Sequence, residues 1–210
     1  MTLHDALAAC PLIAILRGVK PDEILGVAGT LYDAGFRAIE VPLNSPDPFA
    51  SIKRLAGTYG DRAMIGAGTV TDPADCRRLA EAGGRLMVAP NYAPDVVEEA
   101  QRLGLVTLPG VATPSEAFAA LRQRVDGLKL FPADAIGMAA LKAWRSVMPK
   151  DALLLPVGGI DAASIADWRK AGADGFGIGG ALYRPGTDLD TLAKTAKDFV
   201  AAARAAFPRD

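Results

Sequence analysis

The amino-acid sequence predicts an α/β fold, a single (β/α)8 TIM barrel in which residues 1–210 form one domain. The first observation is a series of eight short apolar segments, each suited in length to a buried parallel strand. The second is a set of helical patterns between these segments, several of them closed by a Gly before the next strand. Units of about 20–25 residues fill the chain and leave no linker, as a small barrel requires.

The predicted strands are mostly apolar and bounded by turn residues. Runs without strict polar alternation are typical of parallel strands that are covered on both faces. In chain order, the predicted strands are 12–16, 38–43, 63–68, 86–89, 106–109, 127–131, 153–157 and 175–178.

Start and stop signals place helices between these strands. The segment 21–34 begins with Pro21 and is followed by Gly35, the usual asymmetry of Pro at a helix start and Gly at its end. Thr113 and Glu116 have the spacing of a capping box, which predicts another helix start. Similar punctuation opens helices near residues 72, 93 and 161 and closes them near residues 83, 104 and 172.

An open doubly wound sheet is the alternative fold, because glycine-rich turns occur at 66–68 and 177–179. The dinucleotide-binding fingerprint requires a third Gly three residues after the second. Thr71 and Leu182 occupy those positions, so neither turn completes it. The sequence therefore disfavours a dinucleotide site, and we expect no cofactor.

Composition excludes several classes of partner. The chain carries 23 basic and 24 acidic residues, so we expect no nucleic-acid partner. The apolar runs fall short of the roughly 20 residues of a membrane-spanning helix, which predicts no membrane partner. Two distant cysteines, Cys10 and Cys76, give no disulfide framework and indicate a cytoplasmic protein.

A single histidine, His4, restricts the chemistry further. A zinc site normally draws on clustered His and Cys ligands, so we expect no metal. A Ser-His or Cys-His pair would have to recruit His4 from the chain start. Proton transfer must therefore come from Glu, Asp, Lys, Tyr or water.

Two charged residues lie inside predicted strands, Glu40 within 38–43 and Lys129 within 127–131. Strand alternation turns both into the barrel if their apolar neighbours face the helices. Buried charges are costly unless paired or neutralised. One interpretation is a structural ion pair between Glu40 and Lys129.

The other interpretation is imine chemistry. Burial disfavours the charged form of a lysine, so the Lys129 amine would become a nucleophile near neutral pH. It would attack a ketone and form an imine, an electron sink that lets a carbon–carbon bond beta to the imine carbon break. Glu40 is the candidate for the proton transfers.

Further candidates lie just past predicted strands, at the end where barrels place active sites. Arg17 could bind a carboxylate in a bidentate fork, and Thr69 could add a hydroxyl hydrogen bond. Ser45 could hydrogen-bond a substrate hydroxyl. Each residue also has a purely structural explanation. Arg17 could be a surface arginine, Thr69 a helix cap, and Ser45 part of a polar loop.

Two glycine pairs follow the seventh and eighth predicted strands, Gly158-Gly159 and Gly179-Gly180. Barrels often hold a phosphate there on backbone N–H groups. Tight turns also favour glycine, and they explain single glycines more easily than two pairs.

Seven segments carry a family resemblance: IAILRG (13–18), AIEVPL (38–43), IGAGTV (65–70), APN (89–91), LPG (108–110), LKLFP (128–132) and PVGGI (156–160). Together they resemble the 2-keto-3-deoxy-6-phosphogluconate and 6-phosphogalactonate aldolases, class I lyases that use no metal. The resemblance implies that Lys129 forms a Schiff base, that Glu40 is the proton donor and acceptor, and that Arg17 and Thr69 contact substrate. It also implies a homotrimer.

The segment LNSP (43–46) and Val157 resemble the phosphogalactonate branch, since the phosphogluconate branch tends to carry an arginine-containing loop and a threonine there. We therefore expect cleavage of 2-dehydro-3-deoxy-6-phosphogalactonate to pyruvate and glyceraldehyde 3-phosphate. The family often has a serine beside the last glycine pair, where this chain has Ala181. The alternatives are the gluconate epimer, an unphosphorylated keto acid, and a non-covalent phosphosugar isomerase or synthase.

Overall fold

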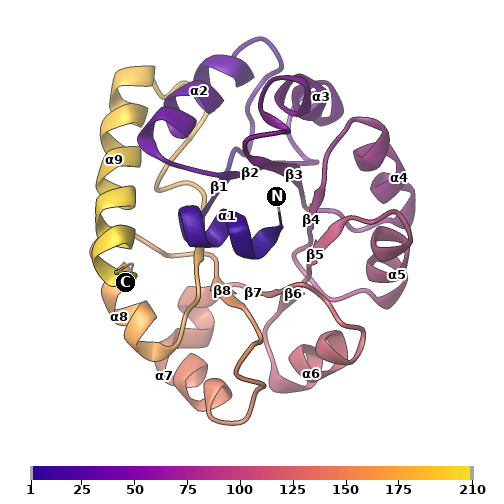
Figure 1. Ribbon diagram of the computed structural model, residues 1–210, viewed down its shortest axis with the longest axis vertical. Coiled ribbons are helices and arrows are strands. Elements are labelled where there is room, and N and C mark those ends of the chain that lie inside the picture. The colour runs from indigo at the N-terminus through magenta and orange to yellow at the C-terminus, as the bar shows by residue number, and fades with distance from the viewer. Residues whose placement is uncertain (1, 209–210) are drawn as a thin grey trace.

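The computed structural model describes residues 2–208, in which short strands alternate with helices (Figure 1). The helices are α1 (Leu3–Ala9), α2 (Ile24–Ala34), α3 (Pro48–Tyr59), α4 (Pro73–Glu81), α5 (Pro94–Arg102), α6 (Pro114–Arg122), α7 (Ala133–Arg145), α8 (Ile165–Ala171) and α9 (Leu189–Ala206). The strands are β1 (Leu12–Ile15), β2 (Ala38–Pro42), β3 (Met64–Gly68), β4 (Leu86–Val88), β5 (Val106–Leu108), β6 (Gly110–Val111), β7 (Leu128–Leu130), β8 (Leu154–Pro156) and β9 (Phe176–Ile178).

The strands pair in parallel in two sheets. One has the order β5-β4-β3-β2-β1-β9, and the other has the order β6-β7-β8. Pro109 separates β5 from β6, and an isolated parallel bridge joins Val157 to Gly177 between the β8 and β9 segments. The strands surround the centre of the molecule, and α2 to α9 lie outside them (Figure 1).

The predicted α/β class is confirmed, and the observed strands agree with the predicted ones to within one or two residues. One difference is the break of the fifth strand at Pro109, which has no N–H to donate to a neighbouring strand. Its carbonyl still accepts a hydrogen bond from the Lys129 N–H at 2.9 Å. Another difference is the start of α2, because Pro21 to Glu23 form a turn and the helix begins at Ile24.

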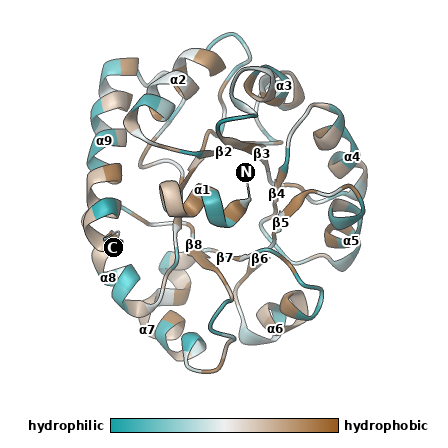
Figure 2. Ribbon diagram, in the orientation of Figure 1, coloured by the Kyte–Doolittle hydropathy of each residue, from teal (hydrophilic) through white to brown (hydrophobic). Residues whose placement is uncertain are grey.

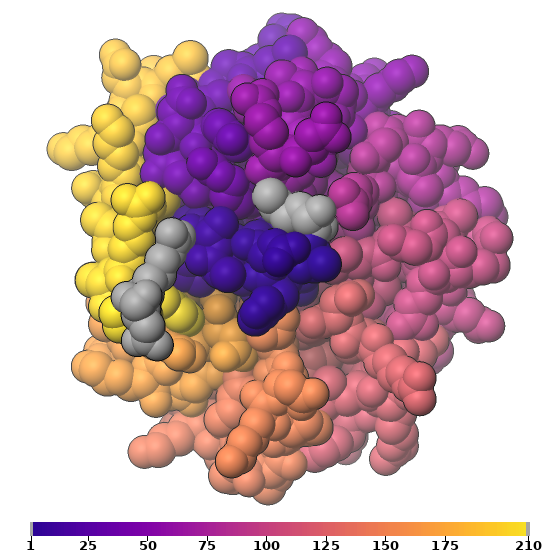
Figure 3. Space-filling model, in the orientation of Figure 1, coloured from indigo at the N-terminus to yellow at the C-terminus, as the bar shows by residue number. Residues whose placement is uncertain are grey.

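The sequence analysis did not identify α1, a seven-residue helix with a capping box between Thr2 and Asp5. Its Leu3, Ala6 and Leu7 belong to a cluster with strand residues that include Ala38, Met64 and Leu86, the first residues of β2, β3 and β4. The other strand residues of this cluster are Ile13, Val88, Leu108 and Leu155. The helix lies across the middle of this face, where its atoms fill the centre (Figure 3). It closes the amino ends of the strands, so the carboxyl ends are left for a site.

A second, larger cluster of apolar side chains lies between the strands and the surrounding helices. The strands and the inward helix faces carry most of the hydrophobic residues (Figure 2). This layer fixes the strands from outside. Within residues 2–208, none of the helices combines the length and the apolar character needed to cross a lipid bilayer.

Candidate active site

Lys129 on β7 and Glu40 on β2 are two of the few buried charged side chains in the described chain, with 5% and 2% of their surfaces exposed. Their strand neighbours, among them Ile39 and Leu128, lie in the cluster between strands and helices. Because side chains alternate along a strand, Glu40 and Lys129 are directed to the inner face. This is the placement that strand alternation predicted.

Burial dominates the electrostatics of both groups. It raises the pKa of Glu40 from its ordinary value of 4.5 to about 7, against the opposing charges of Lys129 and Arg17. It also lowers the pKa of Lys129, where the Glu40 carboxylate opposes the change and the Arg17 charge adds to it. Both shifts favour the neutral forms, so burial promotes the free amine of Lys129 and places the pKa of the Glu40 carboxyl group near neutral pH.

The surroundings of the two groups differ. The Lys129 Nζ lies 4.7 Å from the centre of the Phe131 ring, which covers the amine with an apolar face. The Oε2 atom of Glu40 is buried and has no hydrogen-bond partner among the described residues. A buried oxygen without a partner is costly in a structural ion pair, and it is suited to a group that must exchange protons with a ligand.

The Glu40 carboxylate depends on a glycine in the adjacent strand. A Cβ atom on Gly68, at the end of β3, would overlap the Glu40 carboxylate. Thr69 follows immediately, in a left-handed conformation with a φ of 58°, and its side chain is half-buried. The turn out of β3 therefore makes room for Glu40 and brings Thr69 to the same end of the strands.

Arg17 and Ser45 lie on adjacent loops. The Arg17 guanidinium donates a hydrogen bond to the Asn44 side-chain oxygen, and the Ser45 Oγ accepts one from the Gly18 N–H at 2.9 Å. These bonds join the loop after β1 to the loop after β2. Ser45 is buried, and its hydroxyl contacts the backbone that carries Arg17.

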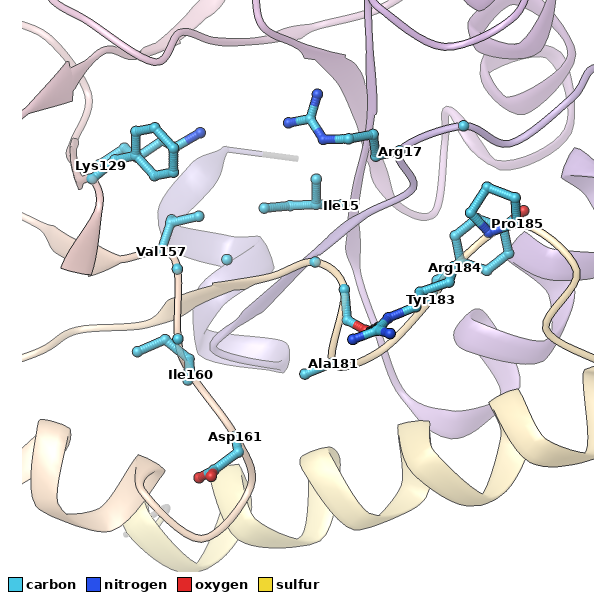
Figure 4. Close-up of a pocket in the computed structure, with 17 residues that line it drawn as sticks. Ile15, Arg17, Lys129, Val157, Ile160, Asp161, Ala181, Tyr183, Arg184 and Pro185 are labelled. Carbon is cyan, nitrogen blue, oxygen red and sulfur yellow. Dashed lines mark hydrogen bonds between the residues drawn. The ribbon is translucent and has the colours of Figure 1, made fainter. Parts of the chain in front are cut away.

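A cavity of about 730 Å³ opens beside these groups (Figure 4). Of the predicted site residues, Arg17, Lys129, Val157 and both glycine pairs line it. Glu40, Thr69 and Ser45 are not among its lining residues. In Figure 4 the side chains of Lys129 and Arg17 extend toward each other across one end of the cavity.

Similarity to known proteins extends over almost the whole chain. A family model described as KDPG and KHG aldolase matches residues 3–194. The chain belongs to this aldolase family. It is therefore an aldolase, a lyase that breaks a carbon–carbon bond.

Three relatives of the aldolase are informative. It is 45% identical over 196 residues to the 2-dehydro-3-deoxy-6-phosphogalactonate aldolase of Escherichia coli (strain K12), over 93% of this chain and 96% of the relative. It matches a solved structure described as native KDPGal with a TM-score of 0.93 and 44% identity, over 95% and 97% of the two chains. It also matches KDPG aldolase from Legionella pneumophila, solved with pyruvate captured as a covalent carbinolamine, with a TM-score of 0.79 and 26% identity, over 96% of each chain.

The sequence analysis did not assign a role in the site to four residues that the structure places there. Gly68 could have been noticed, because it lies in a glycine-rich strand next to the strand of Glu40. Phe131 follows Lys129 by two residues and so lies on the same side of the strand. Arg184 and Tyr183 also line the cavity, and no motif in the sequence points to them.

Within residues 2–208, side chains of His, Cys, Asp and Glu form no group of three or more that could hold a metal ion. The aldolase site instead combines an amine whose pKa is lowered by burial, a carboxyl group with a pKa of about 7 and an arginine. An amine of this kind attacks ketones, and a carboxyl group of this kind can both give and take a proton. Arginine is suited to hold a carboxylate.

Proposed function

We propose that this aldolase cleaves 2-dehydro-3-deoxy-6-phosphogalactonate to pyruvate and glyceraldehyde 3-phosphate through a Schiff base on Lys129. The observation that carries the proposal is the buried Lys129 amine at the cavity wall, with the electrostatically coupled Glu40 carboxyl group beside it. The relative from Escherichia coli carries the name of this substrate. The carbinolamine in the Legionella relative supports covalent chemistry with pyruvate.

The proposed reaction begins when the substrate carboxylate binds to Arg17 and Thr69. The neutral Lys129 amine attacks the C2 ketone, and Glu40 supplies the proton that lets the carbinolamine lose water to give the imine. Glu40 then removes the proton of the C4 hydroxyl as the C3–C4 bond breaks, and its electrons pass into the imine. Glyceraldehyde 3-phosphate leaves, the enamine takes a proton at C3, and water releases pyruvate. A pKa of about 7 suits Glu40 to both directions of transfer.

The galactonate epimer is favoured by Val157, whose buried side chain lines the cavity before the glycine pair. A threonine there would offer a hydroxyl to one epimer, and a valine removes that group. Ser45 contributes by holding the Gly18 backbone beside Arg17. The gluconate epimer and unphosphorylated keto acids are the competing substrates.

The phosphate is assigned to the backbone N–H groups of the two glycine pairs, which line the cavity. Gly158 and Gly159 have φ values of 103° and 69°, a conformation that glycine adopts without a steric penalty. Consecutive N–H groups in such turns form concave anion sites.

The fold proposed around this site is one closed (β/α)8 barrel in a single domain of residues 1–210. Two contacts support closure: the chain continues through Pro109 from one sheet into the other, and the Val157–Gly177 bridge joins their other edges. The resemblance to the aldolase family supports a homotrimer, and the cysteine usage supports a cytoplasmic location.

The decisive experiment is to mix the protein with pyruvate and borohydride and to map the modified peptide by mass spectrometry. We expect a reduced adduct on Lys129, none in Lys129→Met, and an unchanged adduct in Lys142→Met, which alters an exposed lysine of α7. Glu40→Gln should still form some adduct, whereas its turnover should fall by roughly 10²- to 10⁴-fold. A folded wild-type protein without an adduct would refute the imine mechanism and favour the non-covalent phosphosugar reaction.

The substrate is identified separately by comparing kcat/KM for the galactonate and gluconate epimers. We expect a higher value for the galactonate epimer. A preference for the gluconate epimer would contradict the assignment to Val157 and leave the lysine chemistry intact.

A further inference from the structure

The cavity has an arginine at each end. Arg17 lies at the end where Lys129 is, and the Arg184 side chain extends into the space near Ala181 at the other (Figure 4). A substrate with a carboxylate at one terminus and a phosphate at the other carries negative charge at both ends, which is complementary to this arrangement. Gly180 lies at the same end as Arg184, because its carbonyl accepts a hydrogen bond from the Arg184 Nε.

The segment that carries Arg184 is held in place by several contacts. The Tyr183 hydroxyl donates a hydrogen bond to a Glu23 carboxylate oxygen at 3.0 Å, and the Arg184 N–H donates one to the Thr187 Oγ1 at 3.2 Å. Pro185 packs so closely on Gly18 that a Cβ atom on Gly18 would lie 2.7 Å from it. The Arg184 backbone is therefore tied to the loop that carries Arg17.

The Arg184 guanidinium is held in orientation by one hydrogen bond, and its other donors have no partner among the described residues. Its Nε donates a hydrogen bond to the Gly180 carbonyl at 3.0 Å. In residues 2–208 neither terminal nitrogen of Arg184 has a hydrogen bond or an ion pair. An arginine anchored through Nε keeps both terminal amino groups available for the oxygens of an anion.

No neighbouring carboxylate neutralises this arginine among the described ion pairs. Asp161 also lines the cavity, but its Oδ1 accepts a hydrogen bond from the Ser164 N–H at 2.8 Å. Its side chain turns away from Arg184 (Figure 4). Ala181 and the glycines contribute no side-chain donor, so Arg184 is the charged donor at this end.

We propose that Arg184 binds the substrate phosphate together with the N–H groups of the glycine pairs, and that it sets the preference for a phosphorylated substrate. This inference rests on the function proposed above. Arg184 supplies the charged hydrogen bonds that Gly180 and Ala181, which lack hydroxyl groups, cannot supply. Such bonds are among the stronger polar contacts in proteins, so their loss should be measurable.

The test uses the condensation of pyruvate with glyceraldehyde 3-phosphate or with glyceraldehyde, and compares the two values of kcat/KM. We expect Arg184→Gln to lower the ratio of phosphorylated to unphosphorylated activity by roughly 10- to 100-fold. Arg184→Lys should lower it less, because it keeps the charge but loses the fork. Arg122→Gln, which changes an exposed arginine outside the cavity, should leave the ratio unchanged.

The borohydride adduct with pyruvate separates the possible outcomes, because pyruvate carries no phosphate. A normal adduct in Arg184→Gln shows that the variant is folded, and an unchanged ratio in that sample would overturn the role of Arg184 alone. If the wild-type protein forms no adduct, the proposed function fails and this inference fails with it. Inorganic phosphate should also inhibit the wild-type reaction more strongly than that of Arg184→Gln.

Discussion

At the scale of single residues, the site is governed by the cost of burying charge. Glu40 and Lys129 attract each other, yet burial shifts the pKa of each toward its neutral form. A surface ion pair would show the opposite directions, because mutual attraction favours both charged forms. The pair is therefore better suited to proton exchange than to holding strands together.

The raised pKa of Glu40 predicts how stability changes with pH. Between pH 4.5 and about 7 the folded protein holds this proton more tightly than the unfolded chain does. The stability that the bound proton contributes is therefore fully present below pH 4.5, and it is lost as the pH rises through 7. A shift of this size corresponds to about 3 kcal/mol at most. Gln at position 40 does not titrate. We therefore expect the difference in the free energy of unfolding, Glu40→Gln minus wild type, to increase by up to this amount between pH 4.5 and 7.5.

Urea denaturation at several pH values measures this difference. Glu98→Gln, on the exposed face of α5, is the matched control and should follow the wild-type curve. Lys129 affects the pH dependence of stability in the opposite direction, because its pKa is lower in the folded protein than in the unfolded chain. Its contribution makes stability rise with pH between the lowered pKa and the ordinary value of 10.5. Parallel curves for Glu40→Gln and the wild type would show that Glu40 has no raised pKa.

At the scale of elements, short apolar runs identified the strands, because parallel strands buried on both faces need apolar residues at nearly every position. The same reasoning failed for α1, whose seven residues are too few for a clear helical period. It also failed to divide the fifth strand, since Pro109 lies within an apolar run. Close contact between β2 and β3 at Gly68 became visible only in the structure.

The contact at Gly68 gives a prediction for this pair of strands. Gly68→Ala places a methyl group in the volume of the Glu40 carboxylate, so we expect a loss of turnover and of about 1–3 kcal/mol of stability. Gly57→Ala is the control, because a Cβ atom on Gly57 of α3 meets nothing within 4 Å. It should raise stability by about 0.5–1 kcal/mol, as alanine favours helices. A neutral Gly68→Ala in urea denaturation and turnover assays would contradict the packing.

At the scale of the whole molecule, α1 covers the amino ends of the strands, and the cavity opens where the carboxyl-end loops meet. Arg17, Lys129, Val157 and Arg184 come from four separate segments of the chain and reach the cavity because parallel strands end at one edge. Large apolar side chains that remain exposed in the described chain are Val147 and Leu189.

The family resemblance predicts a homotrimer at this scale. Three chains of 21.8 kDa should give a molar mass of about 65 kDa by light scattering after size exclusion. The mass should stay constant over a tenfold dilution if the interface is permanent. A mass near that of one chain would contradict the trimer.

The sequence by itself determined the α/β class, the parallel strands, and the residues Glu40 and Lys129 as candidates for the chemistry, because these follow from local pattern and from the scarcity of charge in apolar strands. It also supplied Arg17 and the glycine pairs as candidates at the strand ends, and the family resemblance supplied Val157. Only the tertiary structure decided that Gly68 makes room for Glu40, that Ser45 holds the Gly18 backbone, and that Arg184 faces the cavity. These depend on contacts between segments far apart in the chain, and no local pattern records which side chains such contacts bring together.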